Sequence, residues 1–314
     1  MSACLLCGSE SAAALFPFTD RLHRTTERCF TILRCGQCGL MRLDPQPTPA
    51  ESLEYHPENY WFAPDATTAG RLEEAYRRLV LRDHARFVAR ALGDSAVRGR
   101  LLDVGCGGGL LLGMLRERGI RVVGLDNSAA AAQIAWSRQR VPSVCGVLEN
   151  APLRDGVFAA VTMFHVLEHV HDPRAYVAAA HRLLAPGGRL IVQTPNAACW
   201  QFRLLGRFWS GLDVPRHLYD FRARDLRRLL ESGGFAVLRL KHFSWRDNPA
   251  SLATSLAPGL DPMGRRTRRV PESAAVRIAK DLAYLALVAA SVPFALLEAA
   301  CGAGATITIE ASKP

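Results

Sequence analysis

Lysine is almost absent from this 314-residue chain, in which three lysines stand against 36 arginines. Arginine therefore carries nearly all of the net charge of +10. A basic balance can indicate nucleic acid, an anionic membrane surface or phosphorylated substrates as partners. Arginine in place of lysine, together with abundant alanine, is also typical of a biased base composition, and no arginine block is interleaved with aromatic residues. The charge therefore assigns no function, and its densest cluster, residues 265–269, is predicted to be a solvated loop.

The sequence also lacks a hydrophobic leader, since its first residues lead straight into a cysteine motif, which predicts a cytoplasmic protein. The uncharged run Leu282–Leu297 is shorter than the roughly 20 apolar residues of a spanning helix, and Pro293 interrupts it. Two interpretations of this run stay open. It forms a helix or helical pair buried against the domain or a homodimer mate, or it makes peripheral membrane contact assisted by the arginine cluster.

What is present suits a folded chain with one large and one small domain: hydrophobic residues make up 49% and charged residues 22%. The small domain is predicted at residues 1–44, where two C-x-x-C pairs are each followed by glycine. Four thiolates at this spacing predict a closed, tetrahedral and therefore structural zinc site. The competing interpretation is that these cysteines form disulfides, which the missing secretory segment disfavours. The proposed ligands are Cys4, Cys7, Cys35 and Cys38.

Residues 45–98 are predicted to connect the two domains. Three prolines in five residues (45–49) give a stiff extended start. The aromatic residues that follow either pack between the domains or roof a substrate pocket. Apolar residues at helical spacing then predict one long amphipathic helix from Arg71 to Leu92. The aromatic residues are Tyr55, Tyr60, Trp61 and Phe62.

The most informative stretch is residues 101–109, where a hydrophobic strand ends in a glycine-rich turn before a helix. A second strand, Arg121–Leu125, stops at Asp126. A strand, glycine turn, helix, strand and acid in this order bind a nucleoside-bearing cofactor, with the acid placed to take the ribose hydroxyls. Asp103 precedes the turn, and its carboxylate would repel a pyrophosphate but suits a cationic ammonium group. A glycine turn without a ligand would leave both acids unexplained.

Beyond Asp126 the chain alternates predicted helices and strands. Helices are expected over 128–140, from the Asp172-Pro173 start to 184, and over 225–232. Strands are expected over 143–147, 157–164, 189–194 and 235–243. The alternating segment Ala305–Glu310 is expected to be an antiparallel edge strand.

The sequence Leu-Asp-Val-Gly-Cys-Gly-Gly-Gly at 102–109 resembles the D-x-G-x-G-x-G signature of class I S-adenosylmethionine (SAM) methyltransferases. This resemblance implies an α/β fold, a Rossmann-like seven-stranded sheet over residues 99–314, with a hydrophobic helical insertion at 244–304 and a zinc-ribbon-like module before it. It implies SAM as the cofactor. Adenine is expected to be recognised by the backbone near Leu148. The expected SAM-binding residues are Asp103, Gly105, Cys106, Gly107, Gly109, Asp126, Asn127, Leu148, Glu149 and His165.

Three later segments, HVLEHVHDP, LLAPGGRLIVQTPN and PRHLYDF, resemble one branch of these enzymes. That branch includes ubiquinone-type O-methyltransferases and natural-product enzymes, and similar enzymes with N-terminal cysteine knuckles include sugar C-methyltransferases. The resemblance implies a small-molecule acceptor: a sugar, a glycan precursor or a quinone- or polyketide-like hydroxyl or carbon.

Deprotonation of such an acceptor requires a base. His217, in a loop able to cover the pocket, is the leading candidate, with His165 and His169 as alternatives; each could instead satisfy loop backbone. His165, His169 and His171 also suggest a metal site, but a role in fixing the loop is favoured over it.

Two rival functions remain. Some ribosomal RNA methyltransferases place a zinc knuckle before this fold, but the segment after the fourth strand is not of their N/D-P-P-Y type, so nucleic acid is not the expected partner. The second rival function is a non-enzymatic scaffold that binds zinc and SAM. The intact Asp103, glycines and Asp126 argue against it.

Overall fold

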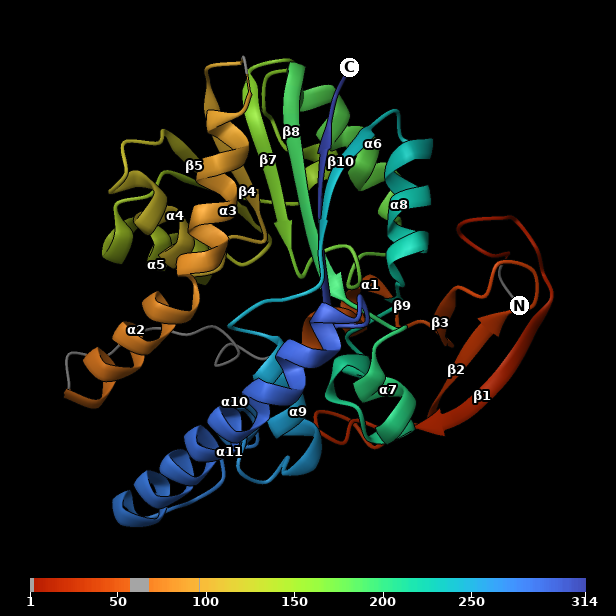
Figure 1. The fold of residues 1–314 in the computed structure, drawn as a ribbon, viewed down its shortest axis with the longest axis vertical. Coiled ribbons are helices and arrows are strands. Elements are labelled where there is room, and N and C mark those ends of the chain that lie inside the picture. The colour runs from red at the N-terminus through yellow and green to blue at the C-terminus, as the bar shows by residue number, and fades with distance from the viewer. Residues whose placement is uncertain (1–2, 57–67, 96) are drawn as a thin grey trace.

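The computed structural model describes residues 3–56, 68–95 and 97–314 (Figure 1). The expected aromatic residues Tyr60, Trp61 and Phe62 lie outside the described residues, whereas Tyr55 is buried.

A seven-stranded sheet forms the centre of the molecule, with the strand order β10-β11-β8-β7-β4-β5-β6. The five strands from β8 to β6 run parallel, while β11 runs antiparallel to both of its neighbours, β8 and β10. This arrangement confirms the Rossmann-like sheet. The strands are β4 (Arg100–Val104), β5 (Val122–Asp126), β6 (Ser143–Cys145), β7 (Phe158–Phe164), β8 (Leu184–Pro195), β10 (Ala236–Lys241) and β11 (Thr306–Ser312).

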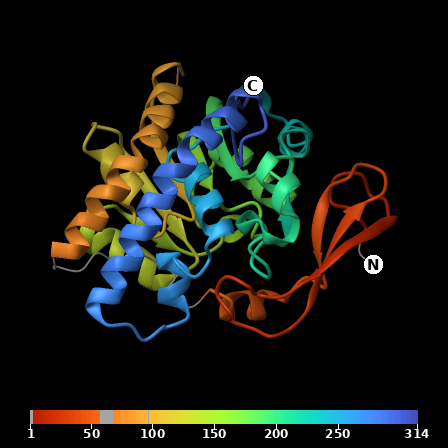
Figure 2. The same cartoon turned by 60° about the horizontal axis from the view of Figure 1, so that its bottom comes forward.

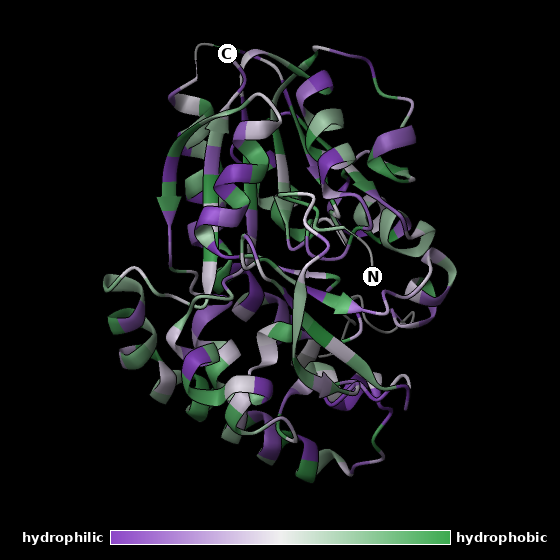
Figure 3. Cartoon of the chain, turned by 90° about the vertical axis from the view of Figure 1, so that its right-hand side faces the viewer, coloured by the Kyte–Doolittle hydropathy of each residue, from purple (hydrophilic) through white to green (hydrophobic). Residues whose placement is uncertain are grey.

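Helices cover both faces of this sheet, and they alternate hydrophilic and hydrophobic residues along their length (Figure 3). Predicted caps hold two of them in place. The Ser128 hydroxyl accepts a hydrogen bond from the Ala131 amide (3.2 Å), and the Asp172 carboxylate accepts two amides at the next helix start (3.0 Å each). The flanking helices are α3 (Arg82–Gly93), α4 (Leu110–Arg116), α5 (Ala129–Gln139), α6 (Pro173–Leu183) and α8 (Ala223–Ser232).

The single long helix expected over 71–92 is wrong, because the chain forms two helices, α2 (Thr68–Val80) and α3, that divide at Leu81. Helix α3 buries one face containing His84, Ala85 and Val88 near the sheet. Helix α2 has few buried residues and extends away from the sheet (Figure 1). The two halves are held by different surroundings, which the continuous apolar spacing did not reveal.

The last strand, β11, is antiparallel as predicted, but its expected place at the edge is wrong. It lies between β8 and β10, and β10 is the edge strand. The polar residues that alternate along β11 are buried rather than exposed. The Thr308 hydroxyl donates to the Gln193 side-chain oxygen (2.8 Å), and Glu310 accepts from Arg239. Paired polar groups therefore occupy the face that the alternation assigned to solvent.

A four-stranded sheet holds the N-terminal module, in the order β1-β2-β3-β9. Its first three strands come from the module, but β9 follows the Arg216–Leu218 segment of the large domain. The amide of Leu43 also donates to the carbonyl of Leu218 (3.0 Å). The module therefore shares a sheet with the large domain and lies against its side (Figure 2). The elements are β1 (Ala12–Phe18), β2 (Phe30–Cys35), β3 (Met41–Asp44) and β9 (Tyr219–Asp220), with the short helix α1 (Pro49–Glu54) after them.

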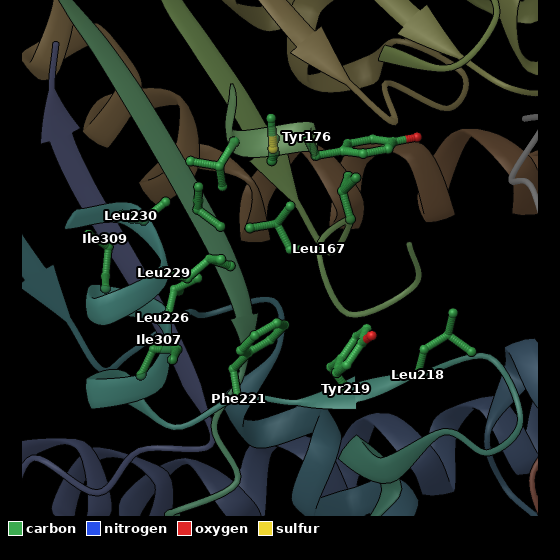
Figure 4. Close-up of a cluster of buried hydrophobic side chains, with 14 of the residues drawn as sticks. Leu167, Tyr176, Leu218, Tyr219, Phe221, Leu226, Leu229, Leu230, Ile307 and Ile309 are labelled. Carbon is green, nitrogen blue, oxygen red and sulfur yellow. The ribbon is translucent and has the colours of Figure 1, made fainter. Parts of the chain in front are cut away.

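One hydrophobic core joins both parts. Buried residues of the module, such as Phe30 and Leu43, belong to the same cluster as those of α6, α8 and β11. Figure 4 shows the middle of this cluster, where the β9 segment faces α8 and the loop after β7. The labelled members are Leu167, Tyr176, Leu218, Tyr219, Phe221, Leu226, Leu229, Leu230, Ile307 and Ile309.

The insertion is helical, as expected, and contains α9 (Asn248–Leu256), α10 (Pro262–Thr267) and the 27-residue α11 (Ala274–Ala300). By length and composition α11 could cross a membrane, yet only 22% of its most apolar window is buried. It packs on α9 and buries residues such as Val288 and Ala295, whereas Leu282, Leu285 and Leu297 are exposed. One face of α11 is thus buried against α9. The homodimer and the membrane interpretations both apply to its exposed face, and both stay predictions.

The expected solvated loop at residues 265–269 is wrong. Most of it belongs to α10, and Arg265 is buried, with ion pairs to Glu272 (2.6 Å) and Asp281. The charge of Arg265 is therefore neutralised by acids of the insertion itself.

The two parts of the molecule are also joined by a buried ion pair. The Arg216 guanidinium lies 2.8 Å from Asp20 of the module and 2.8 Å from Asp213 of the loop before it. It also donates to the carbonyl of Tyr55 (3.2 Å). Because Arg216 and Asp20 side chains are fully buried, each depends on the other for its charge.

Replacing Asp20 by Asn should leave the buried Arg216 charge incompletely matched. We expect a loss of about 3–5 kcal/mol in unfolding free energy, measured by denaturant titration. Glu231→Gln is the matched control, since Glu231 forms an exposed pair with Arg227 and such pairs contribute about 0–1 kcal/mol. Equal effects of the two substitutions would contradict the proposed importance of the buried pair.

Candidate functional site

The glycine turn lies between β4 and α4 at the carboxyl edge of the sheet. Gly105, Gly107 and Gly109 have φ angles of 71°, 51° and 73°, which side chains other than glycine rarely adopt. A Cβ atom at Gly109 would lie 2.9 Å from the Cβ of Ala135. Glycine is therefore required both by conformation and by the close approach of α5.

Asp126 ends β5 beside this turn and holds its shape. Its carboxylate accepts hydrogen bonds from the amides of Gly107 (2.8 Å) and Ser128 (2.9 Å). The carboxylate is thereby fixed at the edge of the sheet where nucleosides bind in folds of this kind.

Asp103 is buried in β4, where the Thr162 hydroxyl donates to it at 2.6 Å. Burial raises the pKa of Asp103 to about 7; Thr162 opposes this rise and the nearby charge of Asp126 adds to it. A cation placed beside this carboxyl group would favour its charged form, so its pairing with the ammonium group of SAM stays a prediction.

The remaining expected cofactor residues surround these acids. Leu148 is fully buried in a short 3-10 turn, η2 (Leu148–Asn150), while Asn127 and Glu149 are exposed after β5 and β6. Cys106 is half-buried within the glycine turn. Residues from three neighbouring loops thus meet at one edge of the sheet, and their contacts with SAM stay predictions.

The loop after β7 adjoins the glycine turn. A Cβ atom at Gly105 would lie 2.8 Å from Cγ2 of Val166. His165, just before it, has a positive φ of 56° and its amide donates to the carbonyl of Gln193 (2.9 Å). A non-glycine residue held in this conformation is a feature found at functional sites.

His165 lies among acidic partners. Its Nδ1 is 3.1 Å from Glu168 Oε1, and its Nε2 is 3.4 Å from Asp247 Oδ1. Burial lowers the pKa of His165, but Asp247 and Glu168 outweigh it and raise the value to about 9. His165 is therefore protonated at neutral pH, which suits positioning better than proton abstraction.

Two residues that contact His165, namely Gln193 and Asp247, were not identified from the sequence. The side-chain amide of Gln193 in β8 lies 3.0 Å from His165 Nε2 and 2.9 Å from Asp247. A glutamine within a buried strand was a usable signal for the first. Asp247 comes from the insertion, at a sequence distance that no spacing could bridge.

His169 and His217 come from different segments but meet, with ring centroids 4.6 Å apart. His169 Nδ1 donates to the carbonyl of Arg216 (3.1 Å), and His217 Nδ1 donates to that of Gly211 (2.8 Å). Burial, together with neighbouring histidines, lowers the pKa of His169 to about 3 and that of His217 to about 4. Both rings are neutral at pH 7.

The histidines do not group as the sequence analysis considered. His171 lies away from His169, because its Nε2 is 2.7 Å from the carbonyl of Pro47. The histidine that lies beside His169 is His217, from the loop that Arg216 fixes.

The four module cysteines form one cluster, as predicted. Cys4 and Cys38 sulfurs are 3.5 Å apart, as are those of Cys7 and Cys35. Four thiolates around zinc lie about 3.8 Å from one another. Gly8 and Gly39 have φ angles of 73° and 77° and turn the backbone at each knuckle. The five other cysteines lie outside the cluster, and three of them (Cys29, Cys145 and Cys301) are exposed rather than buried.

The strand order, the glycine turn and the acids that flank it define a class I SAM methyltransferase fold. A family model described as "Methyltransferase domain" matches residues 74–240, more than half of the chain. The chain belongs to this methyltransferase family.

Curated relatives agree with this membership. A probable S-adenosylmethionine-dependent methyltransferase of Mycolicibacterium smegmatis is 34% identical over 57% of this chain and 61% of that protein. A ubiquinone biosynthesis O-methyltransferase of Alkalilimnicola ehrlichii is 38% identical over 43% of this chain and 58% of that protein. The chain thus spans about three fifths of the length of these relatives.

Solved structures share the fold. Geranyl diphosphate C-methyltransferase from Streptomyces coelicolor A3(2), solved with Mg²⁺, geranyl-S-thiolodiphosphate and S-adenosyl-L-homocysteine, has a TM-score of 0.50 at 20% identity. The match covers 86% of this chain and 83% of that one.

The raised pKa of Asp103 makes a pH-dependent affinity for SAM the expected result. Below pH 7 Asp103 becomes protonated and no longer attracts a cation, so affinity should fall by up to about tenfold per pH unit and level off above pH 8. Calorimetry between pH 5.5 and 8.5 measures this. Thr162→Val should move the midpoint upward, because it removes the donor that stabilises the carboxylate. An unchanged midpoint in that variant would contradict the assignment to Asp103.

Proposed function

We propose that this chain transfers the methyl group of SAM to a hydroxyl or acidic carbon of a small molecule. The observation that carries the proposal is the contact between the glycine turn, flanked by its two acids, and the loop after β7 that carries His165 and His169. A methyl donor held at the turn and an acceptor held at the histidines would then be neighbours.

The residues fit the cofactor by their chemistry. Asp103 would attract the ammonium group of SAM, the glycines allow close backbone approach, and Asp126 would accept the ribose hydroxyls. Bound there, SAM supplies an electrophilic methyl group on a sulfonium. The chain's own task is to orient the acceptor, keep water away from the methyl group and assist the loss of the acceptor's proton.

His169 and His217 are proposed to activate the acceptor, because each presents an unprotonated Nε2 after donating through Nδ1 to a backbone carbonyl. His165 is proposed to position this region through Glu168 and Asp247. The acceptor classes remain those that the family resemblance implies: a sugar, a glycan precursor or a quinone- or polyketide-like molecule. The names of the curated relatives and the ligands of the solved neighbours support a small molecule.

The first experiment incubates the purified chain with labelled SAM and a pooled cell extract that is then fractionated. We expect label in the small-molecule fraction. Label that enters RNA alone would contradict the proposal and favour the ribosomal RNA alternative.

Asp126→Ala should abolish SAM binding measured by calorimetry, because it removes both the ribose acceptor and the group that holds the Gly107 amide. Asp155→Ala is the control, since Asp155 is an exposed acid paired with Arg182. SAM affinity retained in Asp126→Ala would refute the cofactor site.

We further propose that the cysteine cluster binds structural zinc. Cys35→Ser should lower the zinc content by one equivalent relative to the unaltered chain and lower its melting temperature, because metal binding at such sites contributes folding free energy. Cys29→Ser, at an exposed cysteine outside the cluster, should change neither. Elemental analysis and thermal melting measure both, and unchanged zinc in Cys35→Ser would exclude this site.

A further inference from the structure

A second group of possible metal ligands combines two residues of the loop after β7, which adjoins the glycine turn through Val166, with one residue of the loop before β9. One ligand atom each from Glu168, His169 and His217 lies within 4.8 Å of the others. We call these residues the Glu-His-His cluster. Ligand atoms about 2.1 Å from one ion lie about 3.0–4.2 Å apart in octahedral geometry. A modest inward shift of side chains would therefore let all three bind one ion.

The backbone holds the two segments of the cluster together without using its side chains. The carbonyl of Glu168 accepts hydrogen bonds from the amides of Leu218 (2.7 Å) and Tyr219 (3.3 Å). The buried Arg216 fixes the same loop through Asp20 and Asp213. The site is thus built before any ligand arrives.

Both imidazoles are oriented as metal ligands usually are. A ligating histidine normally donates its other ring N–H to a carbonyl or carboxylate, which fixes its tautomer. His169 and His217 do so to the carbonyls of Arg216 and Gly211. Among the described residues, neither Nε2 has a hydrogen-bond partner, so each lone pair is available.

Glu168 supplies an independent indication. Its side chain is 1% exposed, and Oε1 lies 3.1 Å from His165. Its other oxygen, Oε2, is buried and has no hydrogen-bond partner in the part of the chain that the structure describes. Leaving such an oxygen unsatisfied destabilises the folded chain, and a bound cation would satisfy it.

Two imidazoles and one carboxylate suit divalent first-row transition metals and leave coordination positions open. We propose that the Glu-His-His cluster binds one such ion and that the ion coordinates the acceptor's hydroxyl oxygen next to the methyl donor. This inference rests on the proposed methyl transfer and names how His169 and His217 serve it. They act as ligands, and the acceptor class becomes a hydroxyl compound.

The resulting step balances without another reagent. The coordinated hydroxyl loses its proton to solvent water, because a bound divalent ion stabilises the oxyanion. The oxygen's electron pair forms the bond to the methyl carbon as the carbon–sulfur bond breaks. Sulfur keeps that electron pair, and the sulfonium becomes a neutral thioether.

The test titrates the full chain, purified with zinc in its cysteine cluster, with Co²⁺ followed by visible absorbance and calorimetry. We expect one equivalent to bind. His169→Ala and His217→Ala should weaken binding by about 100-fold or more, beyond the roughly 10- to 100-fold loss typical of removing an outer partner. His217→Asp, which restores a ligand, should recover binding even if the alanine variant folds poorly. His171→Ala is the matched control and should bind normally.

No binding by the unaltered chain, or equal binding by His217→Ala and His171→Ala, would overturn the metal site. SAM affinity and methyl transfer are measured on the same samples. Co²⁺ should raise transfer and leave SAM affinity unchanged; transfer that is indifferent to the ion would overturn its role with the acceptor. If SAM fails to bind while Co²⁺ binds as expected, the proposed function fails and the metal site stands.

Discussion

The buried guanidinium of Arg216 is the interaction on which the arrangement of the two parts depends. It pairs with Asp20 from the N-terminal module and with Asp213 from its own loop, and the next residue is His217. Removing one partner of a buried charge of this kind strongly destabilises the folded chain. The module, the connector carbonyl of Tyr55 and the candidate acceptor site are therefore held by one group. The module thus contacts the loop that carries His217 through Asp20.

The second constraint is the contact between the glycine turn and the loop after β7. Val166 occupies the space that a side chain at Gly105 would need, and His165 adopts a positive φ beside it. The two halves of the proposed reaction thus lie on adjacent loops of adjacent strands. A substitution that shifts one loop would therefore displace the other, because the two are closely packed at Gly105 and Val166.

The sequence predicted local features well. The glycine turn, the helix start at Asp172 and each C-x-x-C pair depend on residues close in the chain, and the repeated cysteine spacing joined the two pairs into one predicted cluster. What it missed depends on long-range contacts. The alternation in β11 indicated an edge strand, but Gln193 and Arg239 pair with its polar residues inside the sheet. Asp247 reaches His165 from the insertion, and His217 rather than His171 meets His169. Apolar spacing alone could not separate α2 from α3, since their surroundings differ.

The pairing of β9 with β3 has a consequence for the order in which the chain assembles during synthesis. The three module strands are complete by residue 44, but their fourth neighbour is not made until residue 220. The central sheet is completed later still, because β11 (Thr306–Ser312) lies between β8 and β10 but is made after both. A nascent chain therefore carries an unpaired β3 edge until β9 is made, and an unpaired β8 edge from the completion of β8 until β11 is made. Deletion of β11 alone would leave the edges of β8 and β10 open, where they could pair with another chain.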